Sequence, residues 1–365
     1  MKKVLIIGLT ERMGGVETFI YNTTRFSNRE KYEYDFLVHG TEKTVFQDEI
    51  SEFYGDSAKH FYYVTSFKKN PIKSFKELSR FYKEHGNDYD YVHLQTGATS
   101  EIVYVFPFSL FYRFKVISHS HNGNGYSPVV NSLFRPIVNM ISYKELSCSA
   151  EATEWLFGKR KKNKVEIINN GIDTRKFTFN STQRKELREK YGISEETFVV
   201  GHIGRFSEQK NHKMILKIFS EILKLREDSV LMLVGAGELK DSVEKKAHEL
   251  GLTKNIIFCG LQSKTNKYYS AFDVFLMPSL YEGLPIVGIE AQSEGLPCFF
   301  SRNVSEQICI TDNAHLIPLE ESADNWAKLI VNSKCKNREK YAKLVHENGY
   351  SIQSTVNTLE KVYEV

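Results

Sequence analysis

Residues 273–301 read DVFLMPSLYEGLPIVGIEAQSEGLPCFFS, and this stretch predicts a strand, a helix and a second strand. The apolar run at 273–279 is typical of a buried strand, and 297–301 resumes that pattern. Pro285 is well placed as the first helical residue, because a missing N–H costs nothing there. Gly295 suits a left-handed helix end, after which Pro297 forbids further helix. Elements in this order predict parallel strands joined by a helix.

The tetrapeptide EGLP occurs twice in this stretch, at 282–285 and 294–297, and its copies are predicted to lie at opposite ends of the helix. The first copy places unpaired backbone amides at the carboxyl edge of a sheet, where open α/β sheets bind ligands. Glu282 there can accept hydrogen bonds from hydroxyl groups, and Glu290 could reach a second set. Glu294 in the second copy is expected to be solvated, because the helix dipole disfavours a carboxylate at that end.

The same alternation of apolar runs and helical stretches covers most of the chain in two series. The first extends from VLIIGL at 4–9 to FKVISHS at 114–120, and the second from FVVGHIGR at 198–205 to PCFFS at 297–301. Such series predict an α/β protein with two doubly wound parallel sheets. We expect a first domain over 1–178, a polar linker over 179–197, a second domain over 198–351 and a final helix at 352–365. Two such domains imply a cleft between them, which is a common place for ligands.

Composition excludes several classes of protein. The chain has 365 residues and a formal net charge of +4, which is too weak to argue for nucleic acid and fits small anions or an anionic membrane surface equally well. Its five cysteines are odd in number and lack CxxC spacing, so neither a disulfide framework nor a zinc site is expected. The longest apolar run, at 102–112, is shorter than the ~20 residues of a spanning helix. We therefore expect a cytoplasmic protein.

Two stretches leave surface association with a membrane open. The basic run GKRKKNK at 158–164 is either a solvated run of charges or a segment attracted to anionic lipid. The aromatic run YVFPFSLFYRF at 104–114 is either part of the core or an interfacial patch.

The loop GRFSEQKNH at 204–212 follows a predicted strand and precedes a helix. Gly204 lets the backbone approach a ligand, and Arg205 and Lys210 are expected at the carboxyl end of the strand. A planar guanidinium and a compact ammonium that converge there suit a diphosphate. The alternative is two solvated cations near the start of a helix.

The first half offers weaker signals. Gly14 and Gly15 follow the first strand without forming a dinucleotide fingerprint or a P-loop, so they are either a turn or a close approach to phosphate or sugar. In SHSHN at 118–122, His119 and His121 are expected to point to opposite sides of the strand, so that only one faces a ligand. No third metal ligand accompanies them, and a contact with substrate is the expected role. The sequence Asp-Tyr-Asp at 88–90 precedes a strand, and we assign no metal site to it.

Taken together, these motifs resemble the retaining GT-B enzymes of glycosyltransferase family 4. GRFSEQKNH, followed about seventy residues later by a loop with glutamates at 282 and 290, is similar to the donor half of that family. The glycine pair at 14–15, the strand-end HSHN and INNGIDTRKF at 168–177 match further marks in order. HSHN in particular is similar to bacterial capsule and exopolysaccharide enzymes. The resemblance covers nearly the whole chain and implies that the final helix crosses back to the first domain.

The resemblance also implies a role for each site residue. Arg205 and Lys210, next to Gly204, would bind the donor diphosphate and stabilise the departing nucleoside diphosphate. Glu282 would hold hydroxyls of the transferred sugar beside the amides of Gly283 and Leu284, and Glu290 would bind the ribose. Gly14 and Gly15 would approach the β-phosphate. A strand-end histidine would contact the sugar; His121 is favoured because Asn122 follows it, and His119 remains open.

The implied reaction moves a hexosyl or N-acetylhexosaminyl group from a nucleotide sugar, UDP-linked by resemblance, to a glycan or a lipid-linked oligosaccharide. Fixed cations and helix N-termini can stabilise the leaving phosphate, so we expect no metal or other cofactor. The acceptor would be met at the inner face of the membrane, and nucleic acid is not expected as a partner. The alternatives are a nucleotide-sugar epimerase of the same architecture and a non-catalytic nucleotide-sugar sensor.

Overall fold

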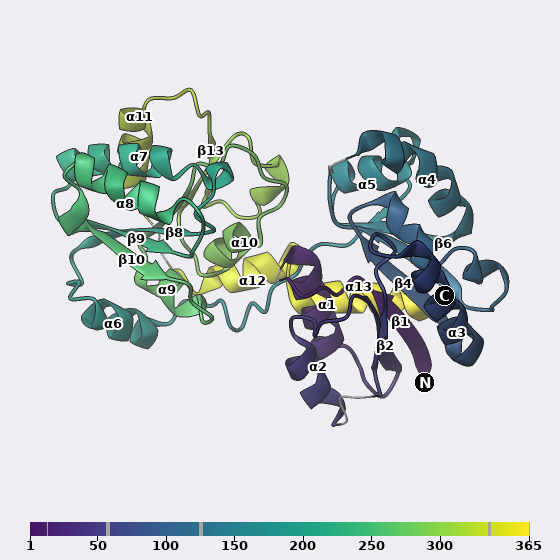
Figure 1. Ribbon diagram of the computed structural model, residues 1–365. Coiled ribbons are helices and arrows are strands. Elements are labelled where there is room, and N and C mark those ends of the chain that lie inside the picture. Colours follow the sequence, from purple (N-terminus) through teal and green to yellow (C-terminus); the bar gives the residue numbers. More distant parts are fainter. Residues whose placement is uncertain (13, 56–58, 124–126, 335–336, 365) are drawn as a thin grey trace. The chain divides into compact units, whose positions relative to one another are not determined.

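The computed structural model describes residues 1–12, 14–55, 59–123, 127–334 and 337–364. The chain divides into two compact units, one of Met1–Gly171 with Ile352–Val365 and one of Ile172–Ser351 (Figure 1). Each unit is an α/β fold with its own parallel sheet, as the two series of apolar runs predict.

Unit 1 holds a seven-stranded parallel sheet in the order β3-β2-β1-β4-β5-β6-β7. Its strands are β1 (Lys2–Ile7), β2 (Tyr32–His39), β3 (Phe61–Val64), β4 (Tyr91–Thr96), β5 (Lys115–Ser120), β6 (Ser142–Ser147) and β7 (Glu166–Ile167). Its helices are α1 (Gly15–Phe26), α2 (Gln47–Tyr54), α3 (Pro71–His85), α4 (Pro128–Ile141), α5 (Ala150–Phe157) and α13 (Ile352–Glu364), with the 3-10 helices η1 (Thr99–Tyr104), η2 (Phe108–Leu110) and η3 (Lys159–Lys161).

Both faces of this sheet are buried, which is why its strands read as continuous apolar runs. In β1, Val4 and Ile6 pack beneath α1, α2 and α13, whereas Leu5 and Ile7 pack beneath α3, α4 and α5 with the 3-10 turns. The final helix is therefore part of unit 1, as predicted. Its Tyr363 hydroxyl lies 2.6 Å from Nδ1 of His93 on β4.

Unit 2 holds a six-stranded parallel sheet in the order β10-β9-β8-β11-β12-β13. Its strands are β8 (Phe198–Ile203), β9 (Ser229–Val234), β10 (Ile256–Gly260), β11 (Val274–Met277), β12 (Cys298–Ser301) and β13 (Ala314–Ile317). Its helices are α6 (Ser181–Lys190), α7 (His212–Leu225), α8 (Lys240–Glu249), α9 (Asn266–Ala271), α10 (Ile286–Ser293), α11 (Ala323–Asn332) and α12 (Lys340–Glu347), with the 3-10 helices η4 (Glu208–Lys210), η5 (Thr253–Asn255) and η6 (Glu306–Ile308).

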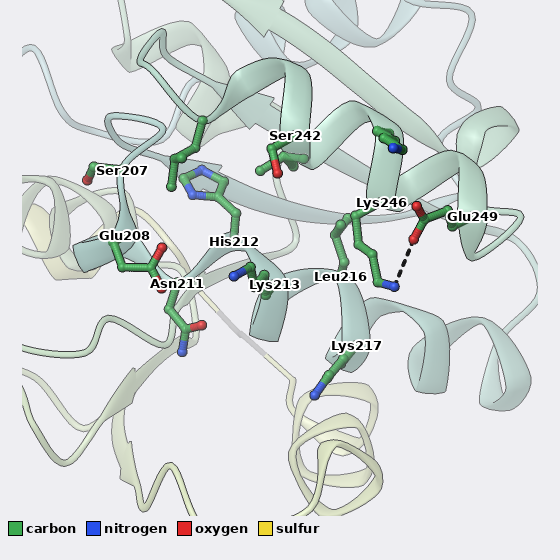
Figure 2. Close-up of a pocket in the computed structure, with 13 residues that line it drawn as sticks. Ser207, Glu208, Asn211, His212, Lys213, Leu216, Lys217, Ser242, Lys246 and Glu249 are labelled. Atoms are coloured by element: carbon green, nitrogen blue, oxygen red, sulfur yellow. Dashed lines mark hydrogen bonds and ion pairs between the residues drawn. The ribbon is translucent and has the colours of Figure 1, made fainter.

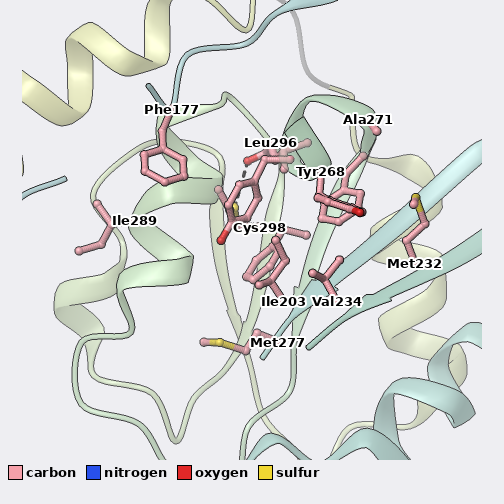
Figure 3. Close-up of a cluster of buried hydrophobic side chains, with 14 of the residues drawn as sticks. Phe177, Ile203, Met232, Val234, Tyr268, Ala271, Met277, Ile289, Leu296 and Cys298 are labelled. Atoms are coloured by element: carbon pink, nitrogen blue, oxygen red, sulfur yellow. Dashed lines mark hydrogen bonds between the residues drawn. The ribbon is translucent and has the colours of Figure 1, made fainter. Parts of the chain in front are cut away.

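One apolar cluster of unit 2 joins the sheet to α9 and α10 (Figure 3). Met277 of β11 and Cys298 of β12 meet Ile289 of α10 in it, and all three are buried. A second cluster on the other face packs α7, α8 and α11 against the same strands. The order of the strands reverses between β8 and β11, and between β1 and β4 in unit 1, so each sheet has a switch point of the kind at which open α/β sheets bind ligands.

The stretch 179–197, expected to be a linker, is an integral part of unit 2. Its helix α6 packs on α9, and the guanidinium of Arg188 is almost fully buried. Arg188 donates hydrogen bonds to the carboxylate of Asp273 at 2.7 Å and to the carbonyl of Ala271 at 3.1 Å. The polarity of this stretch was misleading, because a buried arginine with all three nitrogens hydrogen-bonded looks the same in sequence as a solvated one.

The stretch 273–301 folds as the predicted strand, helix and strand. Helix α10 begins at Ile286 with Pro285 as its N-cap, one residue later than predicted. Gly295 has φ +73°, so the second EGLP does end the helix in the left-handed region that favours glycine.

The expectation that Glu294 is solvated is wrong. Its side chain is fully buried, and Oε2 accepts a 2.8 Å hydrogen bond from the Ser270 hydroxyl. Arg338 covers the helix end by donating to the Glu294 carbonyl at 2.9 Å. Burial raises the pKa of the Glu294 carboxyl to about 7, so this residue is a structural group of the interior of unit 2.

We expect the pH dependence of stability to reveal this buried carboxyl. A pKa raised to about 7 from about 4.5 means that the folded protein loses stability as pH rises through that window, because only the folded state holds the proton there. Glu294→Gln supplies a neutral amide and should reduce the fall in melting temperature across the window. Glu189→Gln, at an exposed position of α6, is the control that should follow the parent protein. An unchanged pH profile for Glu294→Gln would contradict the assignment.

Candidate active site

Two loops at the carboxyl edge of the unit 2 sheet bring Lys210 and Glu282 together. The loop after β8 carries Lys210, and the loop after β11 carries Glu282; β8 and β11 are paired neighbours. The Lys210 ammonium lies 2.5 Å from Oε1 of Glu282, and both side chains are largely buried. Leu280 N donates to the carbonyl of Gln209 at 2.8 Å, so the two loops are also joined through the backbone.

Backbone conformation fixes the position of Lys210. Asn211, which follows it, has φ +54° and serves as the N-cap of α7, in a region that asparagine tolerates better than most residues. The Asn211 side chain also donates to the carbonyl of Pro278 in the other loop at 3.1 Å. A side chain at Gly204 would place Cβ 3.3 Å from Cε of Lys210 and 2.9 Å from Nε2 of His202. Gly204 is thus needed for the lysine to lie where it does.

Arg205 is predicted beside Lys210, but in the structure it pairs with a residue that the sequence interpretation passed over. Its exposed guanidinium lies 3.1 Å from Oε2 of Glu238, in the loop after β9. That loop has the sequence GAGE at 235–238. Cβ on Gly235 would lie 2.0 Å from the Gly204 carbonyl, so the loops after β8 and β9 are packed backbone to backbone. Glu238 therefore belongs to the same sheet edge.

The start of α10 supplies unpaired donors beside Lys210 and Glu282. Within the part of the chain that the structure describes, the amides of Gly283, Leu284, Ile286 and Val287 donate to no acceptor. Gly283 is exposed and Leu284 partly so. Glu290 lies further along the helix, and its Oε2 accepts a 2.8 Å hydrogen bond from the Tyr269 hydroxyl. Burial raises the pKa of Glu290 to about 7, against the opposing effect of that hydrogen bond.

Unit 1 holds the remaining predicted residues at its own sheet edge. Gly14 is the N-cap of α1 and Gly15 its first residue, and both are exposed. A side chain on Gly15 would meet nothing within 4 Å, so internal packing does not demand glycine there. Cβ on Gly14 would lie 2.7 Å from Oε2 of Glu17, a buried carboxylate that accepts a hydrogen bond from Thr10.

The two histidines of SHSHN lie on the same side of the chain, so the expectation of opposite sides is wrong. In an extended segment, residues two apart share a face. Both rings contact Phe19 of α1, and their centroids are 4.3 Å apart. His119 is fully buried, whereas His121 is half-buried, with Nε2 2.6 Å from Oε1 of Gln95. Burial lowers the pKa of His121 to about 3, so its imidazole is neutral near pH 7.

A cavity of about 570 Å³ lies at the carboxyl ends of β1 to β4 in unit 1. Its charged lining consists of three cations, Arg12, Lys68 and Lys69, and three carboxylates, Glu11, Glu42 and Glu101. His39 and Tyr104 form a stacked pair of rings in its wall, with centroids 4.8 Å apart. These residues are far apart in sequence and are brought together at the carboxyl ends of neighbouring strands.

A cavity of about 620 Å³ in unit 2 lies between α7 and α8 (Figure 2). Ser207 and Asn211 line it, but Lys210 and Glu282 do not. Its lysines include Lys246, which is paired with Glu249 at 2.9 Å. None of the predicted site residues lines this cavity.

Among the described residues, one group of acidic and histidine side chains lies close enough to share a cation: Glu33, Asp35 and His60. The Lys3 ammonium already forms an ion pair with the Asp35 carboxylate, with Nζ 3.0 Å from Oδ2. The group includes no predicted site residue. No helix in the described ranges is both long and apolar enough to cross a membrane.

Two family models match the two halves of the chain. Residues 13–176 match the model described as Glycosyltransferase Family 4, and residues 183–350 match the model described as Glycosyl transferases group 1. The boundary between the matches falls near the boundary between the two units.

Relatives of the chain carry glycosyltransferase names. The putative glycosyltransferase EpsF of Bacillus subtilis is 29% identical, with 100% of this chain and 97% of the relative covered. CapH of Staphylococcus aureus, a capsular polysaccharide biosynthesis glycosyltransferase, is 26% identical, with 100% and 99% covered. An Escherichia coli enzyme named UDP-Gal:alpha-D-GlcNAc-diphosphoundecaprenol alpha-1,3-galactosyltransferase is 31% identical over 55% of this chain and 54% of its own.

The fold is shared with solved structures. Anabaena HepE in complex with UDP superimposes with a TM-score of 0.78 at 15% identity, and the match covers 100% of both chains. With its two parallel-sheet units, its two matching family models and its full-length relatives, the chain belongs to the family 4 glycosyltransferases of GT-B fold.

Proposed function

We propose that the protein is a retaining glycosyltransferase that moves a hexosyl or N-acetylhexosaminyl group from a UDP-sugar to a lipid-linked glycan during polysaccharide synthesis. The observation that carries the proposal is the pairing of Lys210 with Glu282 at the switch point of the unit 2 sheet. The names of the relatives support a polysaccharide product, and the Escherichia coli name includes both a UDP-sugar and an undecaprenol-linked acceptor. UDP in the Anabaena complex supports the choice of nucleotide.

Each group at this edge has a partner in a sugar diphosphate. The Lys210 ammonium and the amides of Gly283 and Leu284 offer positive charge and donors to the departing diphosphate. Glu282 offers acceptors to the sugar hydroxyls, and Glu290 offers acceptors to the ribose. Arg205 is exposed at the same edge and would exchange Glu238 for phosphate.

The groups of unit 1 would complete the contacts with the donor. The exposed backbone at Gly14 and Gly15 lies at the start of α1, where unpaired amides and the helix dipole favour a phosphate. His121 is neutral and donates Nε2–H to Gln95, so it would contact the sugar as an uncharged group.

The proposed chemistry needs no protein nucleophile. The bond between the anomeric carbon and the donor phosphate oxygen breaks as the acceptor oxygen bonds to the same face of that carbon. The acceptor proton passes to the departing phosphate, whose negative charge is held by Lys210 and Arg205. These fixed charges would replace a metal ion, so we propose a metal-independent reaction.

The cavity of unit 1 is the proposed acceptor site. Arg12, Lys68 and Lys69 would hold the diphosphate of a lipid-linked glycan, and the His39–Tyr104 pair offers a flat surface to a sugar ring. The loop after β1 would then serve both substrates, with Arg12 on the acceptor and Gly14 on the donor phosphate.

Removing the ammonium of Lys210 should slow transfer by about 10²–10³-fold, because the leaving phosphate then lacks a fixed cation. Initial rates of Lys210→Ala with a UDP-sugar and a lipid-linked acceptor measure this effect. Lys213→Ala, in the cavity between α7 and α8, is the matched control and should retain activity. Because the substitution also leaves Glu282 unpaired, circular dichroism must show an intact fold. A folded variant with full turnover would remove Lys210 from the mechanism.

Chelation of divalent ions should leave activity intact, because the proposed charge stabilisation comes from side chains and amides. The test compares turnover before and after exhaustive treatment with EDTA. Loss of activity that Mn²⁺ or Mg²⁺ restores would contradict the metal-independent proposal.

The acceptor site can be tested separately from the donor site. Lys69→Ala should raise KM for the acceptor by about tenfold while KM for the donor stays unchanged, because a single phosphate contact is lost. Lys31→Ala, an exposed lysine at the amino end of β2, is the control. A rise in KM for the donor, with KM for the acceptor unchanged, would contradict the assignment of Lys69 to the acceptor site.

A further inference from the structure

The cavity between α7 and α8 has no part in the proposed reaction, and its lining is basic. Its volume of about 620 Å³ lies in the range of small-molecule sites. Its charged lining consists of four lysines and two glutamates: Lys213, Lys217, Lys245, Lys246, Glu208 and Glu249 (Figure 2). Lys246 and Glu249 neutralise each other, with Nζ 2.9 Å from Oε2. The cavity therefore presents an excess of positive charge.

The other three lysines of this cavity have no acidic partner. Over the residues that the structure describes, Lys213, Lys217 and Lys245 form no ion pair, whereas Lys224 at the far end of α7 lies 2.8 Å from Glu221. Lys213 and Lys217 are four residues apart on α7, a spacing at which like charges on a helix repel each other. A bound anion would remove this repulsion.

A buried histidine lies in the wall of the cavity beside these lysines. His212 is 3% exposed, and within the described ranges neither of its ring nitrogens has a hydrogen-bond partner. Its ring stacks on Phe206, with centroids 4.3 Å apart. Burial, together with the charge of Lys210, lowers the pKa of His212 to about 4, so the imidazole is neutral near pH 7. Buried polar groups are normally paired, so these nitrogens are available to a ligand.

The lining also includes an apolar surface. Leu216 and Val243 are buried, and Leu239 is partly buried beside them. The hydroxyl-bearing residues Ser207 and Ser242 complete this part of the wall. Lysines suit phosphate oxygens, whereas the apolar side chains suit the uncharged part of an organic molecule. An inorganic anion would leave that apolar surface in contact with water.

We propose that this cavity binds an organic polyphosphate of the class of a nucleoside triphosphate. Lys217 and Lys245 contact the phosphate oxygens, and His212 offers a neutral ring nitrogen to the ligand. Leu216 and Val243 contact its organic part. The site goes beyond the proposed function, because no group of the sugar donor or of the acceptor is assigned to this cavity.

The cavity shares a loop with the proposed donor site. Ser207 and Asn211 line the cavity, whereas Lys210, which lies between them in sequence, does not. The Asn211 side chain also donates to the carbonyl of Pro278 in the loop of Glu282, at 3.1 Å. A ligand in the cavity therefore contacts the loop that positions Lys210 without occupying the donor site. We expect a polyphosphate and UDP to bind at the same time.

Isothermal titration calorimetry of ATP with the full chain tests this site. In EDTA and saturating UDP, the protein should bind ATP but not adenosine, because the lysines recognise the phosphates. Inorganic tripolyphosphate should bind more weakly than ATP, because it lacks the organic part. Lys217→Gln with Lys245→Gln should weaken ATP binding by about tenfold or more, since two charge-assisted contacts are lost. Both lysines are exposed, so the melting temperature should not change.

His212→Phe tests the buried ring separately, because phenylalanine keeps an aromatic ring and removes both nitrogens. It should weaken ATP binding while leaving the melting temperature unchanged or higher, since the nitrogens make no hydrogen bond in the free protein. Unchanged ATP affinity in this variant would contradict the contact with His212.

The matched control removes the same charge outside the cavity. Lys224→Gln with Lys254→Gln changes two exposed lysines of unit 2 that do not line it, and should bind ATP like the parent protein. Equal affinity of the parent and the Lys217/Lys245 variant would overturn the proposal, as would ATP that UDP displaces or tripolyphosphate that binds as tightly as ATP. Stabilisation by UDP in a thermal-shift assay reports the donor site by itself, so failure of this site and failure of the proposed function give different results.

Discussion

The ion pair between Lys210 and Glu282 depends on the parallel pairing of β8 with β11. Parallel strands end at the same edge of a sheet, so residues 72 positions apart in sequence meet there. The ammonium and carboxylate stabilise each other in a partly buried position, where either alone would be costly. The two loops are further held by the Asn211 and Leu280 hydrogen bonds. A site of this kind is preorganised because the sheet and the loops fix its charges.

The sequence predicts what is local and periodic. Alternating apolar runs predict both sheets. Pro285 predicts the start of α10 to within one residue, and Gly295 marks its end. The motif residues Gly204, Lys210 and Glu282 are predicted at one edge because strand ends are visible in sequence. Glu238 was missed because its loop, GAGE, carries no charge pattern of its own. Its proximity to Arg205 follows from the tight packing of Gly235 against Gly204, which only the fold reveals.

The predictions from sequence that proved wrong concern polar residues whose partners are distant in sequence. Arg188 and Glu294 both look solvated, and both are buried against groups contributed by other segments of unit 2. Local rules about helix ends and charged stretches describe the average environment of such residues. A buried charge needs a specific partner, and the partner is supplied by tertiary structure. The incorrect expectation for His119 and His121 has a different origin. They were expected on opposite sides of the strand, but residues two apart in an extended segment share a face.

Both units bury polar groups away from water, and unit 1 does so with Asp35, His93 and His119. Unit 2 buries Glu294, Arg188 and most of the Lys210–Glu282 pair, which favours a rigid arrangement of charge. Unit 1 offers a cavity lined by three cations and three carboxylates. The proposed division, in which unit 2 holds the donor and unit 1 the acceptor, rests on the Lys210–Glu282 pair of unit 2 and on the cavity of unit 1.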